Sequence, residues 1–368
     1  MPENLIDSAQ KLPVIPFSAA EEFSAKKDTL ISEVNQTLAE NPRVKELIGN
    51  NPMSLLFENH SNSALFMSNV FKLNDFAFFA KVVLWVYRTY YNQGFSYDYF
   101  PVAMQAWINA IENNICHDNA VYLTPAYRWI IDNHEKIIES SGQAEDTAFA
   151  IEPGWQNTKK SYLATLLEGN HRQALKIADE AVHSANELAD FYLQVIQPAM
   201  YDIGLLWEKG EISVAQEHLA SAIVTRVMAS LYPRFILIEK SRGKAVVTAA
   251  PNEFHEIGPR MVADLLELDG WDIDYIGANV PAKDLLDLLG KNNPFFLAIS
   301  VSMPFNLDNA REIIHTIKDN PQIRETKIML GGYCIAKNPE LKEKIGADGY
   351  GVSAKEAVNL ASEWWLNA

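Results

Sequence analysis

Apolar positions along the chain follow two different spacings, which divide it into a helical part and a part where strands and helices alternate. From about residue 28 to 138, and again from 162 to 231, apolar residues recur at the spacing of amphipathic helices. After residue 243, short apolar runs typical of buried parallel strands alternate with helical segments. We expect strands at 244–249, 271–276, 295–301, 327–330 and 347–351. The pattern predicts a multidomain α and α/β protein that ends in a flavodoxin-like (Rossmann-like) sheet of five parallel strands.

Residues 1–150 are predicted to form an all-helical domain that is rich in aromatic residues. Between residues 65 and 100 the sequence has no proline and a single glycine, Gly94, so long helices fit better than strands. In one interpretation, the aromatic side chains of this segment fill a helical core. In another, some of them line a pocket for a planar chromophore or a dimer interface, since both are rich in aromatic residues.

A second helical region follows a predicted linker at 146–157, which contains Pro153 and Gly154. Residues 158–238 hold four amphipathic segments, and this spacing predicts a small four-helix bundle. Residues 243–368 then form the predicted α/β domain. The chain is therefore expected to contain three domains.

The composition limits the kinds of protein that this chain can be. Hydrophobic residues make up 48% of the sequence, but no run of about 18 apolar residues predicts a membrane span. The N-terminus lacks the apolar core of a signal peptide, so we expect a cytoplasmic protein without a membrane partner. The net charge of −16 argues against binding DNA, because phosphate binding requires a basic surface. Two cysteines, Cys116 and Cys334, are too few for a disulfide framework.

Two candidate ligand-binding residues, Glu253 and His255, follow the first predicted strand of the α/β domain. They lie on a strand-to-helix loop, at the carboxyl edge where parallel sheets bind their ligands. The stretch Glu253-x-His255-x-x-Gly258 resembles the Asp-x-His-x-x-Gly motif of cobalamin-binding domains, with Glu in place of Asp. The resemblance implies that His255 is the lower axial ligand of cobalt, replacing the base of the cofactor. Glu253 could supply the acceptor that fixes the tautomer of the imidazole, in place of the family's Asp. Its extra methylene could instead shift or break this hydrogen bond.

Two further elements resemble those of the same family. Ser300-Val301-Ser302 ends the third predicted strand and is similar to the Ser-x-Ser/Thr/Leu element that contacts the displaced dimethylbenzimidazole tail. Gly331-Gly332 ends the fourth and matches a Gly-Gly pair at which backbone can approach a ligand closely. Three such elements, after the first, third and fourth predicted strands, are a stronger signal than any one of them.

The helical bundle carries a signature that resembles that of CarH-type photoreceptors. Trp207 is followed after nine residues by Glu217-His218, as in the Trp-x9-Glu-His pattern of that family. The resemblance implies that these three residues contact the upper ligand of adenosylcobalamin. The sequence departs from the family at Glu208, where CarH-type proteins have the His that binds cobalt after illumination.

The N-terminal region departs further, because CarH-type proteins begin with a DNA-binding domain. Its helical character looks closer to the photocobilins, which combine a B12-binding module with a bilin pigment. That resemblance implies a possible second chromophore such as biliverdin. Cys116-His117 is similar to the covalent bilin site of phytochromes, but a dipeptide carries little information.

These resemblances lead to a main hypothesis and two alternatives. The main hypothesis is a light-responsive signalling photoreceptor, not an enzyme, in which photolysis of adenosylcobalamin changes a homo-oligomer or the binding of a protein partner. The first alternative is a corrinoid carrier of a methyltransferase system, which uses the same lower-ligand motif. The second is a partner-binding scaffold that has lost B12. The sequence contains no P-loop and no His-Glu-x-x-His or Gly-x-Ser-x-Gly motif of a competing enzyme class.

Overall fold

The computed structural model describes residues 2–142, 150–235, 239–338 and 341–368. The chain divides into two compact units. The first comprises Met1–Thr147 with Glu208–Gly210, and the second comprises Ala148–Trp207 with Glu211–Ala368. The first residues of the predicted linker, up to residue 149, lie outside the described residues.

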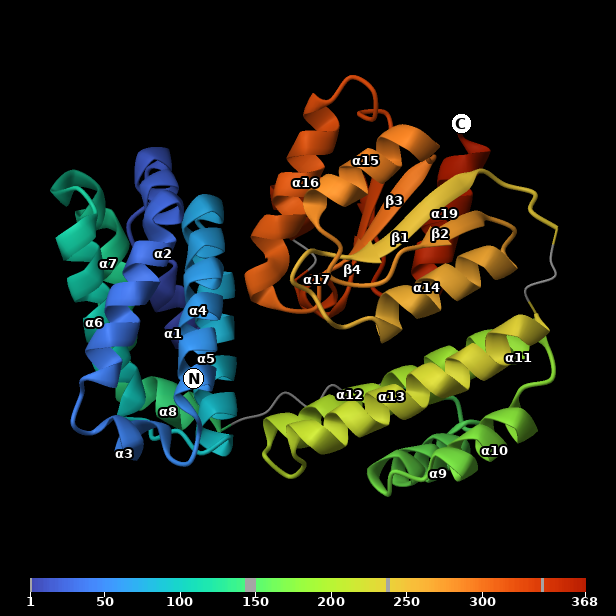
Figure 1. Cartoon of the computed structure of the whole chain (residues 1–368), viewed down its shortest axis with the longest axis horizontal. Helices are drawn as coiled ribbons and strands as arrows, with labels where there is room; N and C mark the ends of the chain where they lie inside the picture. Colours follow the sequence, from blue (N-terminus) through green and yellow to red (C-terminus); the bar gives the residue numbers. More distant parts are fainter. Residues whose placement is uncertain (1, 143–149, 236–238, 339–340) are drawn as a thin grey trace. The chain divides into compact units, whose positions relative to one another are not determined.

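The first unit is helical (Figure 1). Its helices are α1 (Pro2–Ala9), α2 (Phe17–Ala39), α3 (Val44–Ile48), α4 (Met53–Leu73), α5 (Phe76–Asn92), α6 (Tyr99–Asn114), α7 (His117–Asp132) and α8 (His134–Ser141). Asp75 ends the turn before α5 and accepts a hydrogen bond from the backbone N–H of Phe78, as a helix N-cap should. The aromatic segment therefore forms long helices, as the sequence predicts.

Aromatic side chains fill much of the core of the first unit. The rings of Tyr87 and Phe100 are stacked with centroids 3.6 Å apart, and both residues are buried. Phe79 lies against Trp129, and Trp107 stacks on Tyr127. The interpretation of these residues as a helical core agrees with this packing.

The helical part of the second unit consists of α9 (Gln156–Leu167), α10 (His171–Ala181), α11 (Ala185–Phe191), the π-helical turn η1 (Tyr192–Ile196), α12 (Gln197–Glu208), α13 (Val214–Leu231) and the 3-10 turn η2 (Tyr232–Arg234). The segments α11, η1 and α12 follow one another without a break, so they form one long helical element. Ser213 and Gln216 form a capping box at the start of α13, which fixes where this helix begins. We refer to these segments as the bundle.

In the described part of the chain, five parallel strands form a single sheet in the order β2-β1-β3-β4-β5. The strands are β1 (Lys244–Ala249), β2 (Asp272–Tyr275), β3 (Phe296–Ser300), β4 (Lys327–Gly331) and β5 (Gly349–Tyr350). The connecting segments are α14 (Ile257–Leu268), α15 (Ala282–Asn292), η3 (Pro304–Asn306), α16 (Leu307–Asp319), α17 (Tyr333–Lys337), α18 (Leu341–Ile345) and α19 (Ala354–Leu366). The helices α14 and α19 pack together on one face of the sheet, and α15 and α16 lie on the other (Figure 1). This order is that of flavodoxin-like sheets, so the predicted fold class is confirmed.

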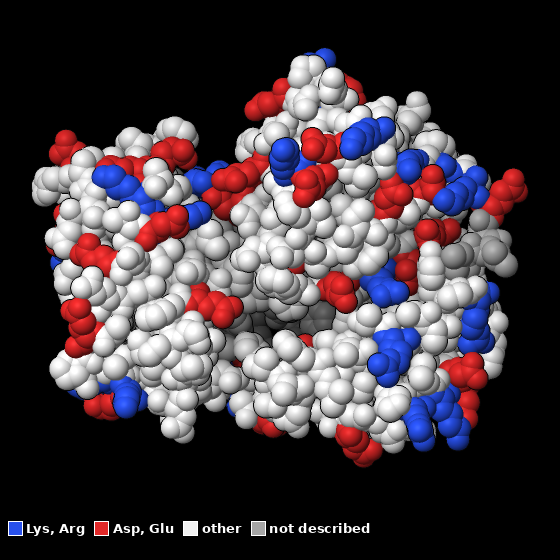
Figure 2. Space-filling model, viewed as in Figure 1, with Lys and Arg blue, Asp and Glu red and all other residues white. Residues whose placement is uncertain are grey.

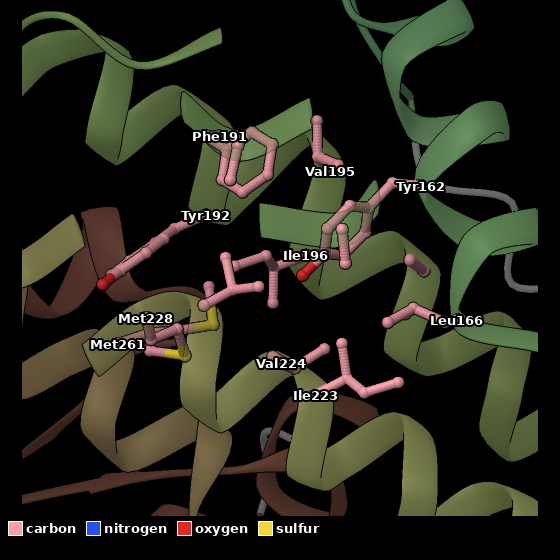
Figure 3. Close-up of a cluster of buried hydrophobic side chains, with 14 of the residues drawn as sticks. Tyr162, Leu166, Phe191, Tyr192, Val195, Ile196, Ile223, Val224, Met228 and Met261 are labelled. Atoms are coloured by element: carbon pink, nitrogen blue, oxygen red, sulfur yellow. The ribbon is translucent and has the colours of Figure 1, made fainter. Parts of the chain in front are cut away.

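A shared hydrophobic core joins the bundle to α14. Met228 of α13 lies beside Met261 of α14 in this cluster (Figure 3). Two tyrosines cross the same boundary: the hydroxyl of Tyr192 donates to Asp264 at 2.7 Å, and that of Tyr232 donates to Glu267. The bundle is therefore held on α14 by apolar packing and by tyrosine–carboxylate hydrogen bonds.

The surface carries charges of both signs. On the face shown in Figure 2, Lys and Arg side chains lie among Asp and Glu side chains rather than forming one continuous basic surface. Within the described ranges, no helix is both long enough and apolar enough to span a lipid bilayer.

We expect Asp264→Asn to stabilise the protein near neutral pH. Burial of Asp264, which is 6% exposed, raises the pKa of its carboxyl from 3.8 to about 6, although the hydrogen bond from Tyr192 opposes the shift. A raised carboxyl pKa contributes stability that is present below pH 3.8 and is lost as the pH rises through about 6. The difference corresponds to roughly 3 kcal/mol. An amide keeps an oxygen that accepts from Tyr192 without carrying a buried charge.

The measurement is the free energy of unfolding between pH 4 and pH 8, in denaturant. The wild type should lose stability over this interval relative to Asp264→Asn. Asp284→Asn, at an exposed position of α15, serves as the control for removing a negative charge. Parallel pH profiles for the wild type and Asp264→Asn would contradict the expectation.

Candidate functional site

The loop after β1 places Glu253 inside the protein and His255 at its surface. Glu253 is fully buried, whereas the His255 side chain is 60% exposed. The imidazole Nδ1 donates to Glu253 Oε1 at 2.5 Å, and the backbone N–H groups of Phe254 and His255 lie at 3.2 and 3.4 Å from the same oxygen. Glu253 therefore supplies the acceptor predicted for it in place of Asp, and its longer side chain does not break the hydrogen bond to the ring.

The second oxygen of Glu253 faces the loop that follows β3. Glu253 Oε2 accepts hydrogen bonds from the backbone N–H groups of Ser302 and Met303, both at 2.9 Å. It also accepts from Nδ2 of Asn306 at 3.2 Å. The two oxygens of one buried carboxylate thus hold two loops together at the carboxyl edge of the sheet.

The charges of the pair are mutually stabilising. Burial raises the pKa of Glu253, but the hydrogen bonds from His255, Met303 N–H and Asn306 outweigh it, so this pKa lies below its ordinary value. Partial enclosure lowers the pKa of His255, but the hydrogen bond to Glu253 and the negative charges of Glu253 and Glu217 raise it above its ordinary value. The carboxylate is therefore ionised and keeps a proton on Nδ1 of the imidazole.

The ends of β3 and β4 meet beside this loop. Ser300 is the register partner of Gly331 in the parallel pairing of the two strands. Gly332 has φ of +93°, and a Cβ there would lie 2.4 Å from the carbonyl oxygen of Val301. Only glycine fits, because both the backbone conformation and the space exclude a side chain.

Gly258 differs from Gly332 in its surroundings. It lies in the first turn of α14, and a Cβ built on it would meet no protein atom within 4 Å. The described protein atoms therefore do not require glycine at this position. The open space is compatible with the close approach of a ligand that the motif implies.

The predicted residues of the bundle lie on α12 and α13. Trp207 is near the end of α12, partly buried against the bundle core. Glu217 is in the first turn of α13, where Oε1 accepts from Ser221 at 2.7 Å and Oε2 lies 2.5 Å from Nδ1 of His218. His218 is 74% exposed.

The bundle faces the carboxyl edge of the sheet, as two observations indicate. The charge of Glu217 raises the pKa of His255, so α13 begins near the loop after β1. The ring of Tyr201 on α12 also lies edge-on to the ring of Tyr333 after β4, with centroids 5.3 Å apart. The structure thus brings Glu253, His255 and the ends of β3 and β4 together, with Glu217 near them.

The arrangement fits a planar metal macrocycle. In the neutral imidazole of His255, the carboxylate of Glu253 holds the one proton on Nδ1, so Nε2 has the lone pair that a metal needs, and no described residue hydrogen-bonds to Nε2. The ring is exposed enough to reach a ligand lying across the edge. Gly331 and Gly332 have no side chains that would separate the backbone at the end of β4 from such a ligand.

Sequence reasoning missed Asn306 and Asn252. Asn306 is fully buried and bonds to both Asn252 and Glu253, and Asn252 has φ of 64°. The Pro-Asn pair before Glu253 signals a turn, and asparagine tolerates positive φ better than most residues. Nothing in the local sequence around Asn306 signals its contact with a loop more than fifty positions away.

We expect Gly332→Ala to destabilise the protein by about 2–4 kcal/mol, because the added methyl group collides with Val301 backbone at positive φ. Gly258→Ala is the matched control, since it adds the same methyl group where space is open. It should be neutral or stabilising by up to about 1 kcal/mol, because alanine is the better helix former. Equal unfolding midpoints for the two variants in denaturant would contradict the close approach at Gly332.

Comparison with known proteins identifies the class of domain. Residues 243–359 match a family model described as a B12 binding domain, and residues 159–232 match a second model with the same description. Dimethylamine corrinoid protein 1 of Methanosarcina mazei is 27% identical over 195 residues, which are 52% of this chain and 89% of that protein. Trimethylamine corrinoid protein 1 of Methanosarcina acetivorans is 25% identical over 189 residues, which are 50% and 87% of the two chains.

A solved structure supports the fold. The monomethylamine corrinoid protein of Methanosarcina barkeri superposes with a TM-score of 0.51 at 21% sequence identity, over 57% of this chain and 99% of that one. This likeness concerns the fold alone.

These findings correct the main functional hypothesis. The expected resemblance to CarH-type photoreceptors and photocobilins is wrong, and so are light sensing, a bilin such as biliverdin and a signalling role, because the relatives are methylamine corrinoid proteins. The lower-ligand motif is common to both classes, so His255 and its neighbours could not separate them. What stands is that residues 159–232 and 243–359 correspond to B12 binding domains and support the binding of a corrinoid.

Proposed function

We propose that the chain is a corrinoid carrier protein of a methyltransferase system and is not itself an enzyme. The observation that carries the proposal is the similarity of the chain to dimethylamine and trimethylamine corrinoid proteins, and the Glu253–His255 pair supplies the imidazole nitrogen that such a carrier would use. That similarity extends over about half of this chain, and the B12 binding models match residues of both the bundle and the sheet. A carrier needs a site that holds the corrinoid firmly and leaves it accessible to other proteins.

The residues of the chain have distinct tasks in this proposal. A bound corrinoid supplies a cobalt centre that accepts a methyl group from a donor and passes it to an acceptor. His255 would hold the cobalt through Nε2, while Glu253 keeps the proton on Nδ1 and fixes the ring. Ser300, Ser302, Gly331 and Gly332 would contact the nucleotide tail of the corrinoid, and the open space at Gly258 would allow the corrinoid to approach closely.

In the proposed arrangement the bundle would cover the bound corrinoid. Trp207 provides an apolar surface there, and Glu217 with His218 provides polar groups. The names of the relatives suggest a methylated amine as the source of the methyl group and a methyltransferase as the protein partner. Self-association, which the sequence also predicts, is a separate proposal that analytical ultracentrifugation would test.

The group bound above cobalt distinguishes the proposed carrier from the adenosylcobalamin-binding protein that was predicted from Trp207, Glu217 and His218. In a carrier, the group that copurifies above cobalt is methyl, water or hydroxide. Recovery of an adenosyl group by chromatography of the extracted corrinoid would instead favour the adenosylcobalamin prediction.

We expect His255→Ala to lower the rate of methyl transfer by at least about tenfold, because a lost metal contact typically costs that much or more. The reduced, cobalamin-loaded protein is mixed with a methylamine-specific methyltransferase from the same organism and its methylated amine. Formation of demethylated amine and the absorption spectrum of the bound corrinoid are followed together.

His315→Ala is the matched control, because His315 is an exposed histidine on α16 of the same α/β domain. It should behave as the wild type does. A wild-type protein that binds equimolar cobalamin but exchanges no methyl group with any such methyltransferase would refute the carrier function. Failure to bind cobalamin at all would refute the site as well.

A further inference from the structure

Asn306 occupies a central position between the two loops of the site. It is fully buried at the end of η3, directly before α16. Its Nδ2 group donates to Glu253 Oε2 at 3.2 Å and to the carbonyl oxygen of Asn252 at 3.1 Å. Its Oδ1 lies 3.3 Å from Nδ2 of Asn252, which donates to it. One side chain therefore holds both the backbone before Glu253 and the carboxylate of Glu253.

The need for such a residue follows from the side chain of glutamate. Glutamate has one more rotatable bond than aspartate, so more contacts are needed to hold its carboxylate in a single orientation. Backbone N–H groups of Ser302 and Met303 fix one oxygen from the side of β3. Asn306 adds a donor to that oxygen and ties it to the loop that carries His255.

The hydrogen bonds between Asn306 and Asn252 matter because of the backbone conformation of Asn252. Its backbone has φ of 64°, a conformation that is held in place by bonds from its neighbours. Besides Asn306, the side chain of Asn279 accepts from the backbone N–H of Asn252 at 2.9 Å. Replacing Asn306 therefore removes hydrogen bonds both from the Glu253 carboxylate, which orients the imidazole, and from the turn at Asn252 that precedes Glu253.

We propose that Asn306 is a positioning residue for the lower axial imidazole. It touches neither the corrinoid nor His255, and it acts through Glu253 and Asn252. The inference rests on the proposed role of His255 as the cobalt ligand. Its consequence is that loss of Asn306 lowers the fraction of bound corrinoid ligated by His255 without removing the corrinoid.

Asn306→Leu tests this role, because leucine has a similar size and forms no hydrogen bond. Asn309→Leu is the matched control: Asn309 lies three positions later, and its Nδ2 donates at 2.8 Å to the carbonyl oxygen of Pro251, in the same loop. The control removes a bond to that loop without removing a bond to Glu253. A general loss of loop support would affect both variants alike.

The readout is the electron paramagnetic resonance spectrum of each protein loaded with cobalamin in the Co(II) state. An axial nitrogen splits the cobalt lines, and labelling histidine with ¹⁵N changes this splitting only when the nitrogen belongs to the protein. We expect the ratio of His-ligated to unligated corrinoid to fall about tenfold in Asn306→Leu, as for other residues that orient metal ligands. Asn309→Leu should match the wild type.

The outcomes separate this inference from the proposed function. If the wild type shows no splitting from labelled histidine, the role of His255 itself is refuted. If the wild type shows this splitting, and the ratio of His-ligated to unligated corrinoid is the same in Asn306→Leu as in Asn309→Leu, the role of Asn306 is refuted while that of His255 stands. Thermal unfolding of the corrinoid-free variants checks their folding. If Asn306→Leu does not fold, Asn306→Ser is used in its place. A ratio of His-ligated to unligated corrinoid in Asn306→Ser equal to that of the wild type would overturn the inference.

Discussion

One buried negative charge, on Glu253, determines how the carboxyl edge of the sheet is built. A carboxylate that is buried away from water stays ionised only when hydrogen-bond donors surround it. Here the donors come from two loops and from the imidazole of His255. The loops after β1 and β3 are thereby joined, although the residues involved lie about fifty positions apart. The same hydrogen bonds that satisfy the charge also fix the orientation of the imidazole. Stability and ligand orientation depend here on one group.

The sequence allowed much of the sheet to be predicted and only part of the site. The buried strands appear as apolar runs such as the one at 244–249, and alternation with helices leaves few possible topologies. His255 could be placed at the carboxyl edge because the loop after a parallel strand must lie there. Asn306 could not be found in this way, because its bonds to Asn252 and Glu253 depend on how two loops meet in space.

The functional class was harder to predict than the cofactor. Trp207, Glu217 and His218 carried the resemblance to photoreceptors, but the relatives are methylamine corrinoid proteins, so this short pattern did not identify the functional class. The sequence also left open whether Glu253, with one methylene more than aspartate, reaches His255. The structure accommodates the extra methylene by burying the carboxylate against Ser302 and Met303, so the ring is still reached.

The π-helical turn at Tyr192–Ile196 has a consequence for the whole bundle. A π-helical turn contains one residue more than an α-helical turn, so it rotates all later residues by about a quarter turn relative to a continuous α-helix. Tyr192, the first residue of this turn, donates to Asp264, and Trp207 follows after the turn. The extra residue in this turn therefore determines the direction in which the side chains of α12 point. Loss of a single residue in this turn would redirect Trp207 while leaving every side chain of α12 chemically unchanged.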